Sequence, residues 1–167
     1  PLMLKLNYSD RIIRQVLEQT TTIAMVGASA SWVRPSNFAM KYLQQKKYRV
    51  IPVNPVISGT KIHGETCYAE LAEVPGPFEM VDIFRRSEDA GKIVDEAINL
   101  KNEKGIKIIW MQLGVIDHAA SARAESEGFT VIMDRCPKIE FGRLNHELSW
   151  SGINTGVISS KRPRLAR

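Results

Sequence analysis

Residues 22–36, TIAMVGASASWVRPS, contain the transition that decides the fold of this chain. The first five, Thr22–Val26, form a short apolar run of the kind found in strands that are buried on both faces of a sheet. The run stops at Gly27, a residue that can take the backbone conformations a sharp turn requires. A polar loop follows, and the apolar residues of segment 36–45 then recur at helical spacing. This stretch therefore predicts a strand, a tight turn and a helix.

The alternation of strand and helix continues to residue 133. Expected strands lie at 22–26, 48–53, 80–84, 106–113 and 130–133, and expected helices at 9–18, 36–45, 87–103 and 117–127. Two parallel strands need a connection of a dozen or so residues, which a helix between them provides. We therefore expect an α/β fold, a Rossmann-like three-layer sandwich around a five-stranded parallel sheet with the order 3-2-1-4-5.

The length and charge of the chain indicate one domain with a basic tail. A chain of 167 residues can bury a single core. We expect an amino-terminal helical segment at 1–19, packed on a ligand-binding domain at 20–150, and a disordered tail at 151–167. From residue 161 onward this tail holds four cations and no acid, and without them the formal charge falls from +5 to +1. The near-neutral body makes nucleic acid a poor candidate partner.

Cysteine usage and hydropathy favour a cytoplasmic protein without a membrane partner. Cys67 and Cys136 lie far apart and lack metal-ligand spacing, so we expect neither a disulfide framework nor a metal site. No apolar run approaches the roughly 20 residues of a membrane span, and no secretion signal is visible. The sequence leaves the oligomeric state open.

The carboxyl ends of the expected strands are the place to look for a ligand site, because ligands of open parallel sheets bind there. After the first strand, Gly27 lets the backbone approach a phosphate, and the helix start near Ser36 offers unpaired N–H groups. The dinucleotide fingerprint G-x-G-x-x-G is absent, since Ser29 and Trp32 occupy the positions of its second and third glycines. A phosphate ligand is therefore favoured, and NAD is disfavoured.

The end of the second strand reads Val53-Asn54, where an NAD site has an acidic residue for the ribose hydroxyls. A carboxylate would repel a ribose phosphate, whereas the amide of Asn54 can donate to one. Coenzyme A carries such a phosphate at the 3′ position and NADP at the 2′ position. Both ligands stay open on this evidence.

Three arginines near strand ends, Arg34, Arg85 and Arg86, add the positive charge that a diphosphate and a ribose phosphate need. Their guanidinium groups match phosphate oxygens in a bidentate manner. The competing interpretation is that Arg85 or Arg86 pairs with Glu88 or Asp89 at the surface, where such a pair contributes about 0 to 1 kcal/mol.

The ordered motifs of the chain resemble a known family. From residue 23 to residue 144 they read VGAS, RPS, YRVIPVNP, GTKIHGETCYAEL, VDIFRRSED, WMQLGV and MDRCPKIEFGRL. This series is similar to that of the small stand-alone CoA-binding proteins, which are related to the amino-terminal domain of the succinyl-CoA synthetase alpha subunit. The resemblance implies a Rossmann-like fold and coenzyme A, or an acyl-CoA, as the ligand.

The resemblance also implies where the ligand binds. Residues of the first turn would meet the phosphates, those after the second strand would lie beside the nucleotide, and those after the third and fourth strands would line the groove. Together with their neighbours, the candidate cofactor-binding residues are Gly27, Ala28, Ser29, Arg34, Pro35, Ser36, Asn54, Pro55, Phe84, Arg85, Arg86, Gln112 and Gly114.

Motifs for catalysis are missing from the sequence. We find no G-x-S-x-G elbow, no G-x-x-x-x-G-K-[ST] phosphate loop and no H-E-x-x-H zinc helix. His63, His118 and His146 fall in expected loops or on helix surfaces, where solvated or capping roles are typical. We therefore expect a binding protein without autonomous catalysis. The alternative is an NAD(P)-binding or acyl-CoA-processing enzyme subunit that needs a partner chain.

Overall fold

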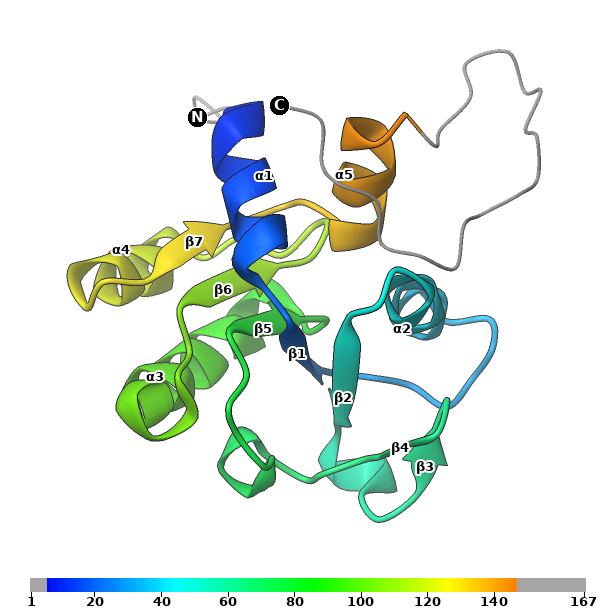
Figure 1. The fold of residues 1–167 in the computed structure, drawn as a ribbon. Coiled ribbons are helices and arrows are strands. Elements are labelled where there is room, and N and C mark those ends of the chain that lie inside the picture. Colours follow the sequence, from blue (N-terminus) through cyan, green and yellow to red (C-terminus); the bar gives the residue numbers. More distant parts are fainter. Residues whose placement is uncertain (1–5, 147–167) are drawn as a thin grey trace.

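The computed structural model describes residues 6–146, which form a five-stranded parallel sheet with helices on both sides (Figure 1). The strands of this sheet are β1 (Thr22–Val26), β2 (Arg49–Val53), β5 (Met80–Ile83), β6 (Ile108–Met111) and β7 (Thr130–Ile132). Every neighbouring pair is parallel. The five expected strands and the Rossmann-like α/β class are confirmed.

Two layers of helices enclose the sheet, as the alternation of elements predicts. One layer consists of α1 (Asp10–Gln19), α2 (Pro35–Gln45) and α5 (Pro137–Leu144), and the other consists of α3 (Ser87–Lys104) and α4 (His118–Ser126). The residues of β1 alternate between the two cores: Ile23 and Met25 pack with the α1 layer, whereas Ala24 and Val26 pack with the α3 layer. This double burial explains the continuous apolar run at 22–26.

The strands follow the order β2-β1-β5-β6-β7 across the sheet. The third strand along the chain, β5, therefore pairs with β1, whereas the order 3-2-1-4-5 places it outside β2. The outer edge of β2 is already occupied, because the N–H of Tyr68 donates to the carbonyl of Pro52 and the N–H of Asn54 donates to the carbonyl of Tyr68. With this edge covered, β5 pairs on the free side of β1.

The segment that covers β2 connects it to β5 without a long helix. It contains the short helices η1 (Pro55–Ile57) and η2 (Leu71–Glu73), with the hairpin of β3 (Lys61–Ile62) and β4 (Glu65–Thr66) between them. Sequence periodicity assigned no element to this segment, because two-residue strands and single helical turns are too short to show a period.

Side-chain caps fix two of the helix starts. The side chain of Ser9 accepts from the N–H of Ile12 at 3.2 Å, and that of Asp117 accepts from the N–H of Ala120 at 3.0 Å. The start of α3 has no such cap, since Arg86 takes the N-cap position without a side-chain hydrogen bond. The hydroxyl of Ser87 reaches the turn after β6 instead.

The amino-terminal helix is part of this packing. Ile13, Val16 and Leu17 of α1 are buried in the same cluster as residues of α2 and α5. Across residues 6–146, no helix is both long enough and apolar enough to pass through a membrane. The basic tail expected at 151–167 lies outside the described residues.

Candidate functional site

The direction of the chain across the sheet reverses between β1 and β5, and this is where open α/β sheets bind ligands. The turns that follow the two strands touch at this point. Gly27 has a φ of +88°, and a β-carbon at this position would stand 2.1 Å from the carbonyl oxygen of Phe84. Only glycine fits here, both for its φ and for its lack of a side chain.

The turn after β1, residues 27–31, which we call the β1 turn, has free backbone N–H groups, and two of its carbonyls are bound by side chains. Within residues 6–146, the backbone N–H groups of Ala28, Ser29 and Ala30 make no hydrogen bond. The carbonyls of Ala28 and Ser29 are held by side chains from other elements: Nδ2 of Asn54 donates to the first, and Nδ2 of Asn37 donates to the second, each at 2.9 Å. Successive free N–H groups with their carbonyls turned away form an anion-binding arrangement.

The start of α2 contributes less than the sequence suggested. Arg34 is its N-cap, and Pro35 at the first helical position has no N–H to offer. The N–H of Asn37 already donates to the carbonyl of Arg34 at 3.0 Å. Within residues 6–146, Ser36 is thus the one residue of this first turn whose N–H has no acceptor, although the sequence indicated several, and the β1 turn carries most of the donors.

Two clefts open at the carboxyl ends of the strands. The first, which we call the β5–β6 cleft, has a volume of about 780 Å³ and lies between the turns after β5 and β6. Its lining combines apolar groups with the amide of Gln112, which is almost fully buried and has no partner for its Oε1 within the described chain. The lining residues are Pro35, Phe84, Arg85, Arg86, Asp89, Gln112, Leu113, Gly114 and Val115.

Hydrogen bonds from two sides fix the floor of the β5–β6 cleft at Gly114. The Oδ1 of Asp134 accepts from the N–H of Gly114 at 2.7 Å, and the Oγ of Ser87 donates to its carbonyl at 3.2 Å. Ser87 also accepts from the N–H of Ile116 at 3.0 Å. The backbone of Gly114 is thus engaged, and its contribution to a ligand is shape and the φ of +81° that this turn requires.

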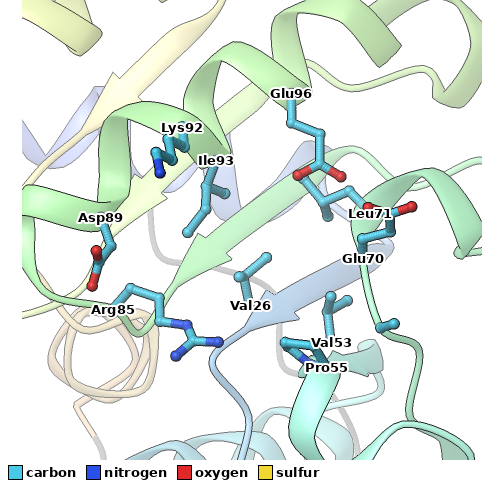
Figure 2. A pocket seen from close by; sticks show the side chains of 11 residues that line it. Val26, Val53, Pro55, Glu70, Leu71, Arg85, Asp89, Lys92, Ile93 and Glu96 are labelled. Atoms are coloured by element: carbon cyan, nitrogen blue, oxygen red, sulfur yellow. The ribbon is translucent and has the colours of Figure 1, made fainter.

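The second cleft, which we call the α3 cleft, has a volume of about 330 Å³ and lies between the end of β2 and α3. Figure 2 shows Arg85 at one end of it and the carboxylates of Glu70 and Glu96 at the other, with Val26 and Val53 below. The Oε1 of Glu96 has no hydrogen-bond partner among the described residues. Burial raises the pKa of Glu96, although N–H groups of η2 bind its carboxylate and oppose that change.

Acidic side chains line the α3 cleft, although the sequence shows no acid at the end of β2, where a ribose was expected. The residues directly after β2, Asn54 and Pro55, carry no acid, but the fold brings Glu70 and Glu96 into the same cleft from positions far along the chain. Sequence spacing gave no signal for either residue, because η2 and α3 meet only in the folded chain.

The three candidate arginines differ in their surroundings. Arg85 is half-buried, lines both clefts, and forms no ion pair within residues 6–146. Arg86 is exposed and pairs with Glu88 at 2.9 Å and with Asp89 at 3.3 Å. Arg34 is exposed at the start of α2 and likewise has no ion pair in the described chain. Arg85 is therefore the arginine best placed to meet an anion.

A buried acid lies beneath the site. Asp82 on β5 is fully buried and neither of its carboxyl oxygens has a partner within the described residues. Burial raises its pKa well above the usual range, which favours the neutral acid. Burial likewise raises the pKa of the nearby Cys136 thiol, with hydrogen bonding from Gln112 opposing the change. Cys67 is also buried and has a raised pKa, so neither cysteine is an activated nucleophile.

Other acidic and histidine side chains with the chemistry for acid or base catalysis have structural partners or lie at the surface. Asp134 holds Gly114, and Glu140 pairs with Arg143 at 2.6 Å. His118 and His146 are exposed. His63 is partly exposed, and its Nε2 lies 2.8 Å from Oδ1 of Asn37. No group of three metal-ligating side chains gathers within residues 6–146.

An open α/β sheet with free backbone N–H groups in the turn at its switch point is typical of Rossmann-like domains. The chain belongs to the CoA binding domain family, whose model matches residues 21–142. This membership makes a small-molecule CoA ligand the expected one, and it confirms the family that the sequence motifs resembled.

Three known proteins illustrate what this chain is similar to. A Bacillus subtilis (strain 168) protein described as "Uncharacterized protein YneT" is 34% identical over 133 residues, which cover 80% of this chain and 94% of that protein. A solved structure of a hypothetical protein from Pyrococcus horikoshii OT3 is 33% identical with a TM-score of 0.76, covering 86% of this chain and 99% of the other. A dinucleotide-forming acetyl-coenzyme A synthetase 1 of Ca. Korarchaeum cryptofilum is 23% identical, with a TM-score of 0.53 over 66% of this chain and 25% of the other. This last likeness shows the fold alone.

Proposed function

We propose that the chain binds coenzyme A or an acyl-CoA at the carboxyl ends of its strands and carries out no reaction by itself. The β1 turn is the observation that carries the proposal. Its three free N–H groups face no protein acceptor within residues 6–146, and Asn54 and Asn37 hold its carbonyls back. A phosphate needs donors without nearby carbonyl oxygens, and this turn meets both conditions.

The diphosphate fits at the junction of the two clefts. In the proposed complex it lies against the β1 turn, within reach of the guanidinium of Arg85, which lines both clefts. Hydrogen bonds between a guanidinium and a phosphate are charge-assisted and about twice as strong as neutral ones. Arg34, at the end of the same loop, supplies a second cation.

The pantetheine arm fits the β5–β6 cleft. This arm is a chain of apolar carbons interrupted by two amides, and the cleft offers Phe84, Leu113 and Val115 as apolar contacts. The buried Oε1 of Gln112 lacks a donor in the described chain, and an amide N–H of the arm can provide it. An acyl group on the thiol would extend past Gln112 in this arrangement.

The adenosine fits the α3 cleft. The apolar side chains of Val26, Val53 and Ile93 suit the faces of a purine ring, and the carboxylates of Glu70 and Glu96 suit its 6-amino group, which donates hydrogen bonds. Arg85 at the opposite end suits the phosphates. One end of the cleft therefore offers hydrogen-bond acceptors and the other end offers a cation, which matches an adenine nucleotide.

Calorimetric titration tests the proposal with five probes: CoA, dephospho-CoA, NAD, NADP and ATP. We expect CoA to bind most tightly, and loss of the 3′ phosphate to cost about 1.5 to 3 kcal/mol, the scale of a hydrogen bond to a charged group. Preference for NAD or NADP over CoA would favour the enzyme-subunit alternative. Absence of binding by all five probes would refute the proposal.

The absence of autonomous catalysis needs its own experiment. Acetyl-CoA and succinyl-CoA, incubated with the purified protein, should keep their thioesters at the rate seen with heat-unfolded protein. Chromatography of the nucleotides measures the intact thioester. Faster loss that depends on the folded protein would assign a catalytic role.

A further inference from the structure

His63, in the hairpin of β3 and β4, is linked to the β1 turn through the side chain of Asn37. The Nε2 of His63 lies 2.8 Å from Oδ1 of Asn37 on α2, and Nδ2 of Asn37 donates to the carbonyl of Ser29 at 2.9 Å. Asn37 is 2% exposed, so its amide has little access to water. Three segments of the chain are thus joined in one line: hairpin, α2 and β1 turn.

The chemistry of the groups fixes the direction of this line. A carbonyl oxygen only accepts hydrogen bonds, so the Ser29 carbonyl must face the NH₂ group of the Asn37 amide. The amide oxygen of Asn37 then faces the imidazole, and Nε2 of His63 must carry a hydrogen to bind it. His63 is therefore the donor that orients Asn37, and the free amide rotation that would exchange the two ends of Asn37 is blocked.

The surroundings of His63 hold its ring in place. The ring of Trp32, from the loop that follows the β1 turn, meets the imidazole edge-on with 5.1 Å between centroids. The side chain of Gln44 on α2 donates to the carbonyl of His63 at 3.2 Å. Burial, with the charge of Lys41 as the second cause, lowers the pKa of His63, which keeps the ring neutral near pH 7 with one N–H.

We propose that His63 is a positioning residue for the phosphate-binding turn: by donating from Nε2 to Asn37, it keeps the Ser29 carbonyl turned away from the ligand. Loss of the His63 donor frees the Asn37 amide to rotate, and a released Ser29 carbonyl would place an acceptor oxygen where an anion binds. This inference rests on the proposed function for its effect on affinity, but the line of hydrogen bonds exists without a ligand.

Three substitutions of His63 distinguish the effect of its hydrogen-bond donor from the effect of its backbone conformation. His63 has a φ of +46°, a left-handed conformation that asparagine adopts more readily than glutamine or alanine. In His63→Gln the amide N–H₂ can take the place of Nε2–H, in His63→Asn the amide is too short to reach Asn37, and in His63→Ala no donor remains. The asparagine variant tolerates the left-handed conformation well and is the matched control for folding.

Two measurements on the full chain test this line of hydrogen bonds. Calorimetric titration with CoA should give a dissociation constant about tenfold higher for His63→Ala and His63→Asn, and a value within about threefold of the unmodified protein for His63→Gln. Without ligand, NMR should show His63 as the neutral Nε2–H tautomer. The ¹³C shift of the Ser29 carbonyl should change in the alanine and asparagine variants but not in the glutamine variant.

Each outcome decides the matter. Unchanged CoA affinity in folded His63→Ala, or glutamine no better than alanine, would overturn the proposal, and so would weaker binding with an unchanged Ser29 carbonyl shift. If the unmodified protein binds no CoA, the proposed function fails. The ligand-free Ser29 carbonyl shift then still decides whether His63 positions the turn.

Discussion

Gly27 and Phe84 stand so close that the two turns they belong to form one surface: a β-carbon on residue 27 would lie 2.1 Å from the Phe84 carbonyl oxygen. The N–H of Gly27 donates to Val53 of β2, and the N–H of Phe84 donates to Val26 of β1. The turn after β1 is thereby held between its two neighbouring strands, at the point where the chain changes direction across the sheet.

Replacing Gly27 with alanine should destabilise the fold. The left-handed backbone and the clash with a backbone oxygen act together, and we expect a loss of about 3 kcal/mol or more in the free energy of unfolding. Gly59→Ala is the matched control, because Gly59 has a φ of +86° with no atom within 4 Å of the added carbon. Its cost should be about 1 to 2 kcal/mol in urea denaturation. Equal losses in the two variants would show that the Phe84 contact is unimportant.

Arg85 and Arg86 should differ in their contribution to CoA binding. Arg85→Gln removes a half-buried cation shared by the two clefts, and we expect CoA affinity to fall by about 1.5 to 3 kcal/mol with a weaker dependence on salt. Arg86→Gln removes an exposed cation that already pairs with Glu88 and Asp89, and should cost less than about 1 kcal/mol. Titration at two salt concentrations measures both, and the reverse ranking would contradict the placement of the phosphates.

The α3 cleft should select the base of the ligand. Adenosine 3′,5′-bisphosphate presents a donor at its 6-amino group to Glu70 and Glu96, whereas the inosine analogue presents an acceptor and should bind about tenfold more weakly. Glu96→Gln offers an amide donor to the 6-oxo group and should narrow that difference. Glu103→Gln, an exposed change on the same helix, is the control. Equal binding of the two nucleotides by the unmodified protein would place the base elsewhere.

Asp82 should make the protein less stable as the pH rises. Its pKa is raised by burial, so above the ordinary value of 3.8 the folded state holds a proton that the unfolded chain has released. The free energy of unfolding therefore falls with rising pH, by at most about 1.4 kcal/mol for each pH unit, until the pH reaches the raised pKa. Below 3.8 both states are protonated and the effect vanishes.

Asp82→Asn removes this ionisation while keeping the shape of the side chain. Urea denaturation of both proteins between pH 4 and 8 should give curves that separate as the pH rises, with the variant the more stable at the alkaline end. Other titrating groups are common to the two proteins and cancel in the difference. Parallel curves would mean that Asp82 does not hold a proton in the folded state.

The sequence by itself determined the alternating strands and helices of this protein. The continuous apolar run of β1, the stop at Gly27 and the spacing of apolar residues in α3 are local properties, so the five strands of the parallel sheet, the helices α1 to α4 and the turn at Gly27 could be predicted from neighbouring residues. The ordered motifs likewise indicated the family, which the match over residues 21–142 confirms.

The tertiary structure alone decided which distant groups meet. Tyr68 covers the edge of β2 and leaves β5 beside β1, Asn37 and Asn54 hold the carbonyls of the β1 turn, and Glu70 and Glu96 enter a cleft that seemed free of acids. Hydrogen bonds between side chains and a remote backbone depend on strand pairing and on the angle between helices, and neither leaves a periodic trace in the sequence.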